Sequence, residues 1–218
     1  MATTLKSFTH NKARALPVIL LADVSGSMSV NGKIQALNQA VSEMVATFAA
    51  EEEGRAEIQV AVITFGGTAQ LHLPLQAASE VSWEAMGATG GTPMGRAMEL
   101  AADLIDDREA IPSRAYRPTI VLVSDGMPTD SWEQGLARLT GEGRGAKAFR
   151  MALGIGADAD EAMLARFVGG EEPTVYKAED ARRIRDFFQF LTMSVTSRSR
   201  SANPNAVPQV SDPFSLEF

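Results

Sequence analysis

The chain has 218 residues, of which 45% are hydrophobic and none is Cys; 27 acidic side chains outnumber 20 basic ones and give a formal charge of −7. The lack of cysteine excludes a disulfide framework, an iron–sulfur cluster, a thiolate zinc site and a cysteine nucleophile, and the acidic balance argues against nucleic-acid binding. The two histidines, His10 and His72, are too far apart for ligand spacing, which argues against a histidine metal site or a Ser-His-Asp triad. Any bound metal is therefore expected to be a hard ion held by oxygen ligands.

No segment approaches about 18 consecutive apolar residues, the length that spans a membrane. Residues 1–17 contain basic side chains but lack the apolar stretch of a secretory signal. We therefore expect a cytoplasmic protein.

The first half of the chain predicts a buried strand, a helix and then a hairpin. Residues 17–22 form a continuous apolar run, as in a strand that is buried on both faces, and residues 33–50 carry apolar side chains at helical spacing. Residues 57–65 and 68–75 have strand patterns and are joined by two glycines, which predicts a hairpin with one antiparallel strand. Pro74 has no N–H to donate to a neighbouring strand, which places the second of these strands at the edge of the sheet.

The second half of the chain alternates helices with strands. A glycine-rich loop at residues 86–95 opens a helix over residues 94–105, and the apolar run at residues 118–124 predicts a third buried strand. The remaining elements are helix 131–139, strand 147–155, helix 159–168, short strand 174–176 and helix 180–195. This order predicts an α/β fold with a doubly wound, mostly parallel central sheet, one antiparallel edge strand and helices on both faces.

The composition divides the chain into an N-terminal extension (residues 1–13), one domain (residues 14–196) and a Ser/Pro-rich C-terminal tail (residues 197–218). Apolar residues alternate with polar ones from Phe214 onward, a pattern that suits an extended segment docked in a groove or on a sheet edge. The polar, proline-containing composition also fits a tail without fixed structure. Both interpretations stay open.

Oxygen-bearing side chains gather where two of the predicted strands end. They are Asp23, Ser25 and Ser27 after the first strand, Thr92 in the glycine-rich loop, and Asp125 after the third buried strand. Ligands of doubly wound sheets bind just beyond the carboxyl ends of the strands. Carboxylates and hydroxyls together suit Mg²⁺, which takes an octahedral shell of oxygens and usually keeps several waters. The sequence therefore predicts a magnesium site made of these residues.

The stretches ILLADVSGSM, GGTPMG and VLVSDGMPTD resemble the three loops of the von Willebrand factor A (VWA) domain family. In that family a DxSxS signature, a loop threonine and a third-loop aspartate form the metal-ion-dependent adhesion site, or MIDAS. The resemblance covers residues 14–196 and maps these positions onto Asp23, Ser25, Ser27, Thr92 and Asp125. Within the family, RALPVILLADVSGSM and the short chain look most like the bacterial TerY-type proteins of tellurium-resistance, stress-response and phage-defence loci.

The resemblance implies a module for protein–protein interaction and not an enzyme. In such a site the serines, and in one state the threonine, touch the metal directly, whereas the aspartates hold it mostly through waters. The ion, Mg²⁺ or alternatively Mn²⁺ or Ca²⁺, then attracts a carboxylate from a partner protein into an open position. The TerY-type likeness also implies a cytoplasmic setting and co-encoded kinase, phosphatase or other Ter proteins as partners, with no role for nucleic acid or membrane.

Two other functions are considered for the same residues. A Mg²⁺-dependent phosphotransfer enzyme of haloacid-dehalogenase type would use Asp23 as its nucleophile, but it needs a second Asp two residues later, where this chain has Ser25. A structural scaffold with a vestigial site is the other alternative, and the complete set of ligand candidates argues against it.

Two of the polar residues also have a simple structural interpretation. Thr92 precedes Pro93 and fits the N-cap of the helix that follows. Asp130, with Glu133 after it, fits a capping box for helix 131–139.

Overall fold

The computed structural model describes residues 13–207, so the predicted N-terminal extension lies outside this range except for its last residue. One six-stranded sheet has the order β3-β2-β1-β4-β5-β6. Its strands are β1 (Arg14–Asp23), β2 (Ala56–Gly66), β3 (Thr68–Ala77), β4 (Thr119–Ser124), β5 (Phe149–Ile155) and β6 (Val175–Ala178). The helices are α1 (Lys33–Ala49), α2 (Met94–Asp106), α3 (Trp132–Thr140), α4 (Glu161–Val168) and α5 (Ala181–Arg200), with short 3-10 turns η1 (Gly26–Ser29), η2 (Ala78–Glu80) and η3 (Gly145–Lys147).

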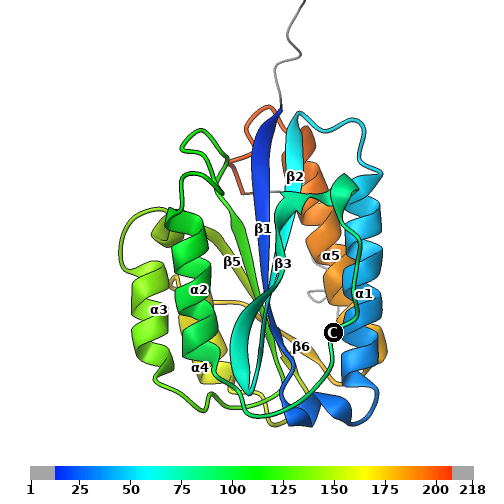
Figure 1. The fold of residues 1–218 in the computed structure, drawn as a ribbon, viewed down its shortest axis with the longest axis vertical. Helices are drawn as coiled ribbons and strands as arrows, with labels where there is room; N and C mark the ends of the chain where they lie inside the picture. Colours follow the sequence, from blue (N-terminus) through cyan, green and yellow to red (C-terminus); the bar gives the residue numbers. More distant parts are fainter. Residues whose placement is uncertain (1–12, 208–218) are drawn as a thin grey trace, which may run out of the picture.

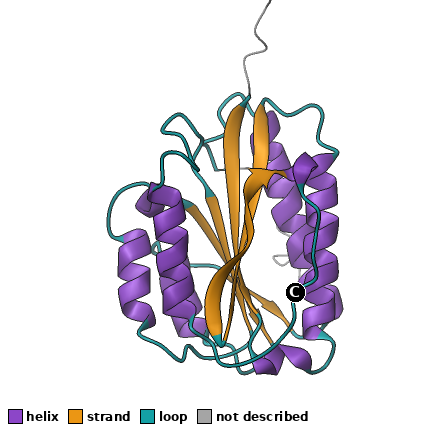
Figure 2. Ribbon diagram, in the orientation of Figure 1, coloured by secondary structure: helices purple, strands orange, loops and turns teal. Residues whose placement is uncertain are grey.

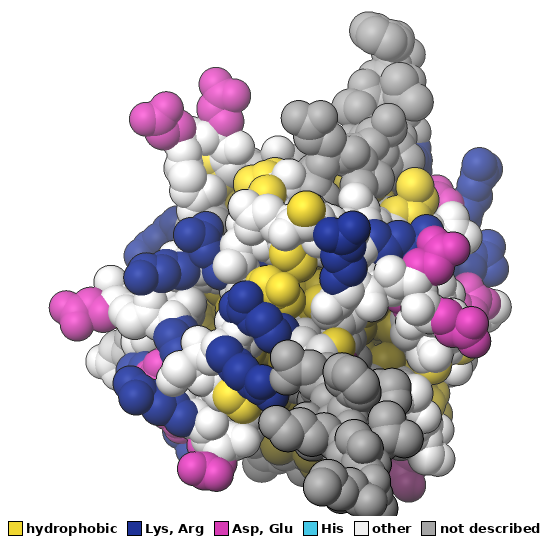
Figure 3. Space-filling model, turned by 90° about the horizontal axis from the view of Figure 1, so that it is seen from above, with side chains coloured by type: hydrophobic (Ala, Val, Ile, Leu, Met, Phe, Trp, Pro, Cys, Tyr) yellow, Lys and Arg dark blue, Asp and Glu magenta, His cyan; other side chains and the backbone are white. Residues whose placement is uncertain are grey.

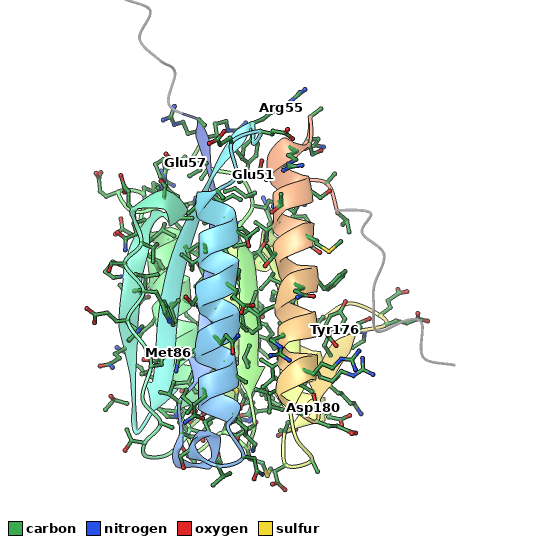
Figure 4. The ribbon with its side chains drawn as sticks, turned by 90° about the vertical axis from the view of Figure 1, so that its right-hand side faces the viewer. Glu51, Arg55, Glu57, Met86, Tyr176 and Asp180 are labelled. Atoms are coloured by element: carbon green, nitrogen blue, oxygen red, sulfur yellow. The ribbon has the colours of Figure 1, made fainter. Side chains whose placement is uncertain are left out.

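The helices cover the two faces of the sheet in two groups (Figure 1, Figure 2). α1 and α5 run side by side over one face (Figure 4), and α2, α3 and α4 lie on the other. Each group buries its own apolar core against the sheet. The central strand β1 serves both cores because its side chains alternate: Leu20 joins the α1/α5 core, and Ile19 and Leu21 join the opposite one. The predicted fold class is confirmed.

The strand at the β3 edge shows the predicted exception to the parallel arrangement. β3 pairs antiparallel with β2, whereas all other neighbouring strands pair in parallel. Pro74 is exposed on β3, where its missing N–H leaves no ladder bond unmade. The hairpin prediction from the two glycines and the edge prediction from Pro74 are both confirmed.

The last helix is longer than its apolar pattern predicts. α5 continues to Arg200 instead of ending at residue 195, because Arg198 is buried and its guanidinium donates to Pro204 O at 2.9 Å and to Thr119 Oγ1 at 2.5 Å. The first residues of the predicted tail therefore pack against the domain, while residues 208–218, with the alternating apolar positions, lie outside the described range. Within residues 13–207 no helix, α5 included, is both long and apolar enough to cross a membrane.

The two ends of the sheet differ in chemistry. The five parallel strands all point the same way, so the loops after β1 and β4 share the lower end of Figure 1. The upper end, which faces the viewer in Figure 3, presents lysine and arginine side chains across its centre. Exposed Arg14 starts β1, and exposed Arg114 and Arg117 precede β4. The predicted metal site thus lies at the end opposite this basic surface.

Candidate metal centre

The site begins with two neighbouring parallel strands. β1 and β4 pair in register up to Ala22 and Val123, so Asp23, the last residue of β1, lies beside the end of β4. Asp125 follows directly after β4. The sheet therefore brings together two carboxylates that are about 100 residues apart in the chain, as the strand pattern predicted.

Hydrogen bonds connect the two carboxylates through the DxSxS loop. Ser25 N donates to Asp23 Oδ1 at 2.8 Å, and the hydroxyls of Ser25 and Ser27 share a hydrogen bond of 3.0 Å. Ser27 Oγ in turn donates to Asp125 Oδ1 at 2.6 Å. On the other side, Ser124 Oγ donates to Asp23 Oδ2 at 2.5 Å, so this strand-end residue positions the Asp23 carboxylate. Four of the five predicted ligands thus form one continuous polar network.

The network is buried on the carboxylate side and open on the hydroxyl side. Asp23 is 0% exposed and Asp125 is 1% exposed, whereas Ser27 is exposed. Burial raises the pKa of Asp23, the hydrogen bonds from Ser124 and Ser25 oppose the rise, and the nearby charge of Asp125 adds to it. In the absence of a cation, burial therefore makes the negative charge of Asp23 unfavourable.

Asp125 has a partner that the sequence does not indicate. Lys33 Nζ donates to Asp125 Oδ2 at 2.7 Å, and the two side chains are 17% and 0% exposed. Lys33 is the first residue of α1, and 91 residues separate it from Asp125. A single lysine at the start of a helix carries no sequence signal for this contact, since only the sheet brings the two together.

The glycine-rich loop that carries Thr92 is held in the site by hydrogen bonds of its backbone. Gly26 N donates to Gly90 O at 2.9 Å, which ties the glycine-rich loop to the DxSxS loop. Thr92 N donates to Thr129 Oγ1 at 3.0 Å, and Thr129 N donates to Thr92 O at 2.9 Å, which ties it to the loop after β4. Within the described part of the chain, no hydrogen bond joins the Thr92 hydroxyl to the other four predicted ligands. Thr92 is thus brought between the two loops, but it is not part of the network.

The two capping predictions are wrong. Pro93, and not Thr92, occupies the position before α2, and no side-chain cap bond is made there. Asp130 does not cap α3: its carboxylate oxygens accept from Gly95 N and Arg96 N, each at 2.9 Å, in the first turn of α2. The local sequence suggested the helix that follows Asp130, but the fold presents its carboxylate to a helix that starts 36 residues earlier.

The side chains fit a hard divalent cation. The donors are two carboxylates and three hydroxyls, which is an all-oxygen set. In residues 13–207 no three His, Cys, Asp or Glu side chains come together as a metal site, so binding here depends on hydroxyls as well as on the two aspartates. The ammonium of Lys33 lies against Asp125, so one of these aspartates is already paired with a positive charge. The assignment of these five residues as ligands stays a prediction.

A family comparison agrees with the geometry. Residues 18–127 match the family model of the von Willebrand factor type A domain. The chain belongs to this family. The matched stretch of the VWA domain contains all five predicted ligands, from Asp23 to Asp125. Comparison with curated proteins gives no match.

Solved structures share the VWA fold at low sequence identity. They include the pilus adhesin SpaC from Lactobacillus rhamnosus GG (TM-score 0.68, 16% identity, 85% of this chain and 30% of that one) and a von Willebrand factor type A protein from Catenulispora acidiphila (0.66, 19%, 84% and 43%). Proximal thread matrix protein 1 from the mussel byssus, solved with zinc in its MIDAS motif, matches with a TM-score of 0.58 and 19% identity over 83% of this chain and 45% of that one. The chain thus spans less than half the length of each of these proteins.

Proposed function

We propose that this protein is a metal-dependent interaction module of the MIDAS type. Its centre holds one Mg²⁺, or in its place Mn²⁺ or Ca²⁺, with oxygen atoms of Asp23, Ser25, Ser27, Thr92 and Asp125. The observation that carries the proposal is the continuous network from Asp23 through the two serine hydroxyls to Asp125 at the carboxyl ends of β1 and β4.

The exposure of the site favours an anionic partner. Ser27 faces solvent beside two buried carboxylates, so a bound ion would have its open coordination position on the Ser27 side. Serine and threonine hydroxyls are neutral, so an ion that they bind directly, with the two aspartates holding it mostly through waters, stays electron-poor. A carboxylate from a partner protein is the natural ligand for that position. Partner binding should therefore require the metal and be lost when a chelator removes it.

We expect no catalysis at this site. A haloacid-dehalogenase-type nucleophile at Asp23 would need an acid/base aspartate two residues later, where this chain has Ser25, and the Asp23 side chain is itself fully buried. A Mg²⁺-dependent assay with a chromogenic phosphate ester tests this point, and turnover that disappears in Asp23→Ala would contradict it.

The finer part of the proposal is a TerY-type role in the cytoplasm, in tellurium resistance, stress response or phage defence. The partners would be proteins with an exposed acidic side chain, such as co-encoded kinase, phosphatase or Ter proteins. The motif RALPVILLADVSGSM supports this assignment.

Affinity capture from the native host tests the proposal. The full chain is immobilised once with Mg²⁺ and once with chelator, alongside Asp23→Ala and the control Glu52→Ala, which removes an exposed carboxylate outside the site. We expect partners that bind the parent and Glu52→Ala only with Mg²⁺ and do not bind Asp23→Ala. Partners retained equally by all three proteins in chelator would contradict the proposal.

A further inference from the structure

Lys33 lies in an electrostatically unusual place for a helix residue. It is the first residue of α1, after Gly32 in the left-handed conformation (φ 70°), and no acidic residue stands in the first turn of this helix. The amino terminus of a helix carries partial positive charge and disfavours a lysine. The contact that compensates this charge is the one to Asp125, at 2.7 Å.

The ammonium group lies inside the candidate metal centre. Asp125 offers one oxygen to Ser27 and the other to Lys33, so the lysine takes up half of the carboxylate that a metal ion would need. A Cβ built on Gly156, the residue after β5, would lie 3.8 Å from Lys33 Nζ. The lysine therefore reaches over the carboxyl end of β4 toward that of β5, and only 17% of its side chain is exposed.

The net charge of the centre changes sign when a divalent ion binds. Two aspartates and one lysine leave one net negative charge, and a divalent ion changes this to one net positive charge. An ammonium held within a few ångströms of the ion repels it, and water screens this repulsion only partly because just 17% of the Lys33 side chain is exposed.

We infer that Lys33 is a tethered cation that competes with the divalent ion for Asp125 and thereby sets the metal affinity of the centre. In the metal-free protein it neutralises the buried Asp125. Metal binding has to displace the ammonium from Asp125 or accept its repulsion. This inference rests on the proposed function, because it requires that the centre binds a metal.

Calorimetric titration of the full chain with Mn²⁺ alone tests the inference. Lys33→Met removes the charge, and Lys33→Gln removes the charge but keeps a hydrogen-bond donor for Asp125, which guards against loss of folding. Lys147→Met is the matched control, because Lys147 is exposed and lies in η3 at the start of β5, at the opposite end of the sheet. We expect Mn²⁺ to bind about tenfold more tightly to both Lys33 variants than to the parent, and equally to Lys147→Met and the parent.

A second measurement separates competition from simple support of the fold. In chelator, the Lys33 variants should melt at lower temperature than the parent, because Asp125 is left buried without a counter-charge. Mn²⁺ should raise their melting temperature by more than it raises that of the parent. Mn²⁺ affinity that is unchanged or weaker in both Lys33 variants would overturn the inference while leaving the proposed function standing. Absence of Mn²⁺ binding in the parent and in every variant would refute the proposed function itself.

Discussion

The contact from Asp130 to α2 predicts effects of substitution that differ from those of a local capping box on α3. In Asp130→Ala, the first turn of α2 loses the acceptors of Gly95 N and Arg96 N, both bonded at 2.9 Å. This turn follows the glycine-rich loop that carries Thr92, so its loosening also affects this part of the metal centre. We therefore expect Asp130→Ala to reduce both stability and Mn²⁺ affinity.

The magnitude follows from the two bonds. Loss of a helix cap typically costs about 1 kcal/mol and at most about 2 kcal/mol, and we count the interaction of the carboxylate with the amino terminus of the helix within this range. For a domain of this size, 1 kcal/mol corresponds to about 2–4 °C, so the melting temperature should fall by roughly 2–8 °C. Asp160→Ala is the matched control, because Asp160 caps its own helix, α4, by accepting from Met163 N at 3.0 Å.

Hydrogen exchange locates the effect. We expect Asp130→Ala to increase exchange at Gly95 and Arg96 with little change in the first turn of α3, and Asp160→Ala to increase it in the first turn of α4. Increased exchange confined to the amides of α3 in Asp130→Ala would indicate the local capping box and contradict the contact between Asp130 and α2. An unchanged melting temperature would refute it as well.

Three further changes test the core and the charges. Burial raises the pKa of Asp23 above 3.8, so the unfolded chain releases this proton at a lower pH than the folded protein does. The metal-free parent should therefore lose stability relative to Asp23→Asn as the pH rises from about 4 through the raised pKa. Urea unfolding at a series of pH values measures the free energies of unfolding of the two proteins, and a constant difference between them contradicts this prediction. Phe188→Ala should lower the free energy of unfolding, measured with urea, by about 3–5 kcal/mol, because Phe188 is buried in the α1/α5 core. A decrease below about 1 kcal/mol would show that α5 does not pack there. Gly135→Ala should lower the free energy of unfolding by about 1–3 kcal/mol or more, because the added Cβ would meet the backbone of Gly95. Gly87→Ala is the control and should unfold like the parent, because Gly87 has open space around it. Equal stability of the two variants would contradict the close packing of α2 and α3.

The sheet could be predicted because its signals are local and repeated. Continuous apolar runs mark the strands that are buried on both faces, and the hairpin follows from two glycines and Pro74. Strand ends then locate Asp23 and Asp125, since parallel neighbours end at the same edge of the sheet. The site was therefore predictable as far as it depends on topology.

The features that the sequence does not predict depend on contacts between distant segments. Lys33 and Asp130 bond to groups on other elements, and the residues next to them in the sequence do not indicate these contacts. The end of α5 was placed too early because apolar periodicity stops at Val195, while the next turns are held by the buried guanidinium of Arg198. Polar contacts of this kind have no periodicity in the sequence, so only the assembled fold reveals them.

We propose that one divalent ion binds between the ends of β1 and β4. Crystals of the full chain soaked with Mn²⁺, with anomalous diffraction data, test it most directly. We expect a single strong anomalous peak within coordination distance of the Ser25 and Ser27 hydroxyls and close to Asp23 and Asp125, and no such peak in Asp23→Ala crystals. A peak elsewhere, or none at this position under saturating Mn²⁺, would contradict it.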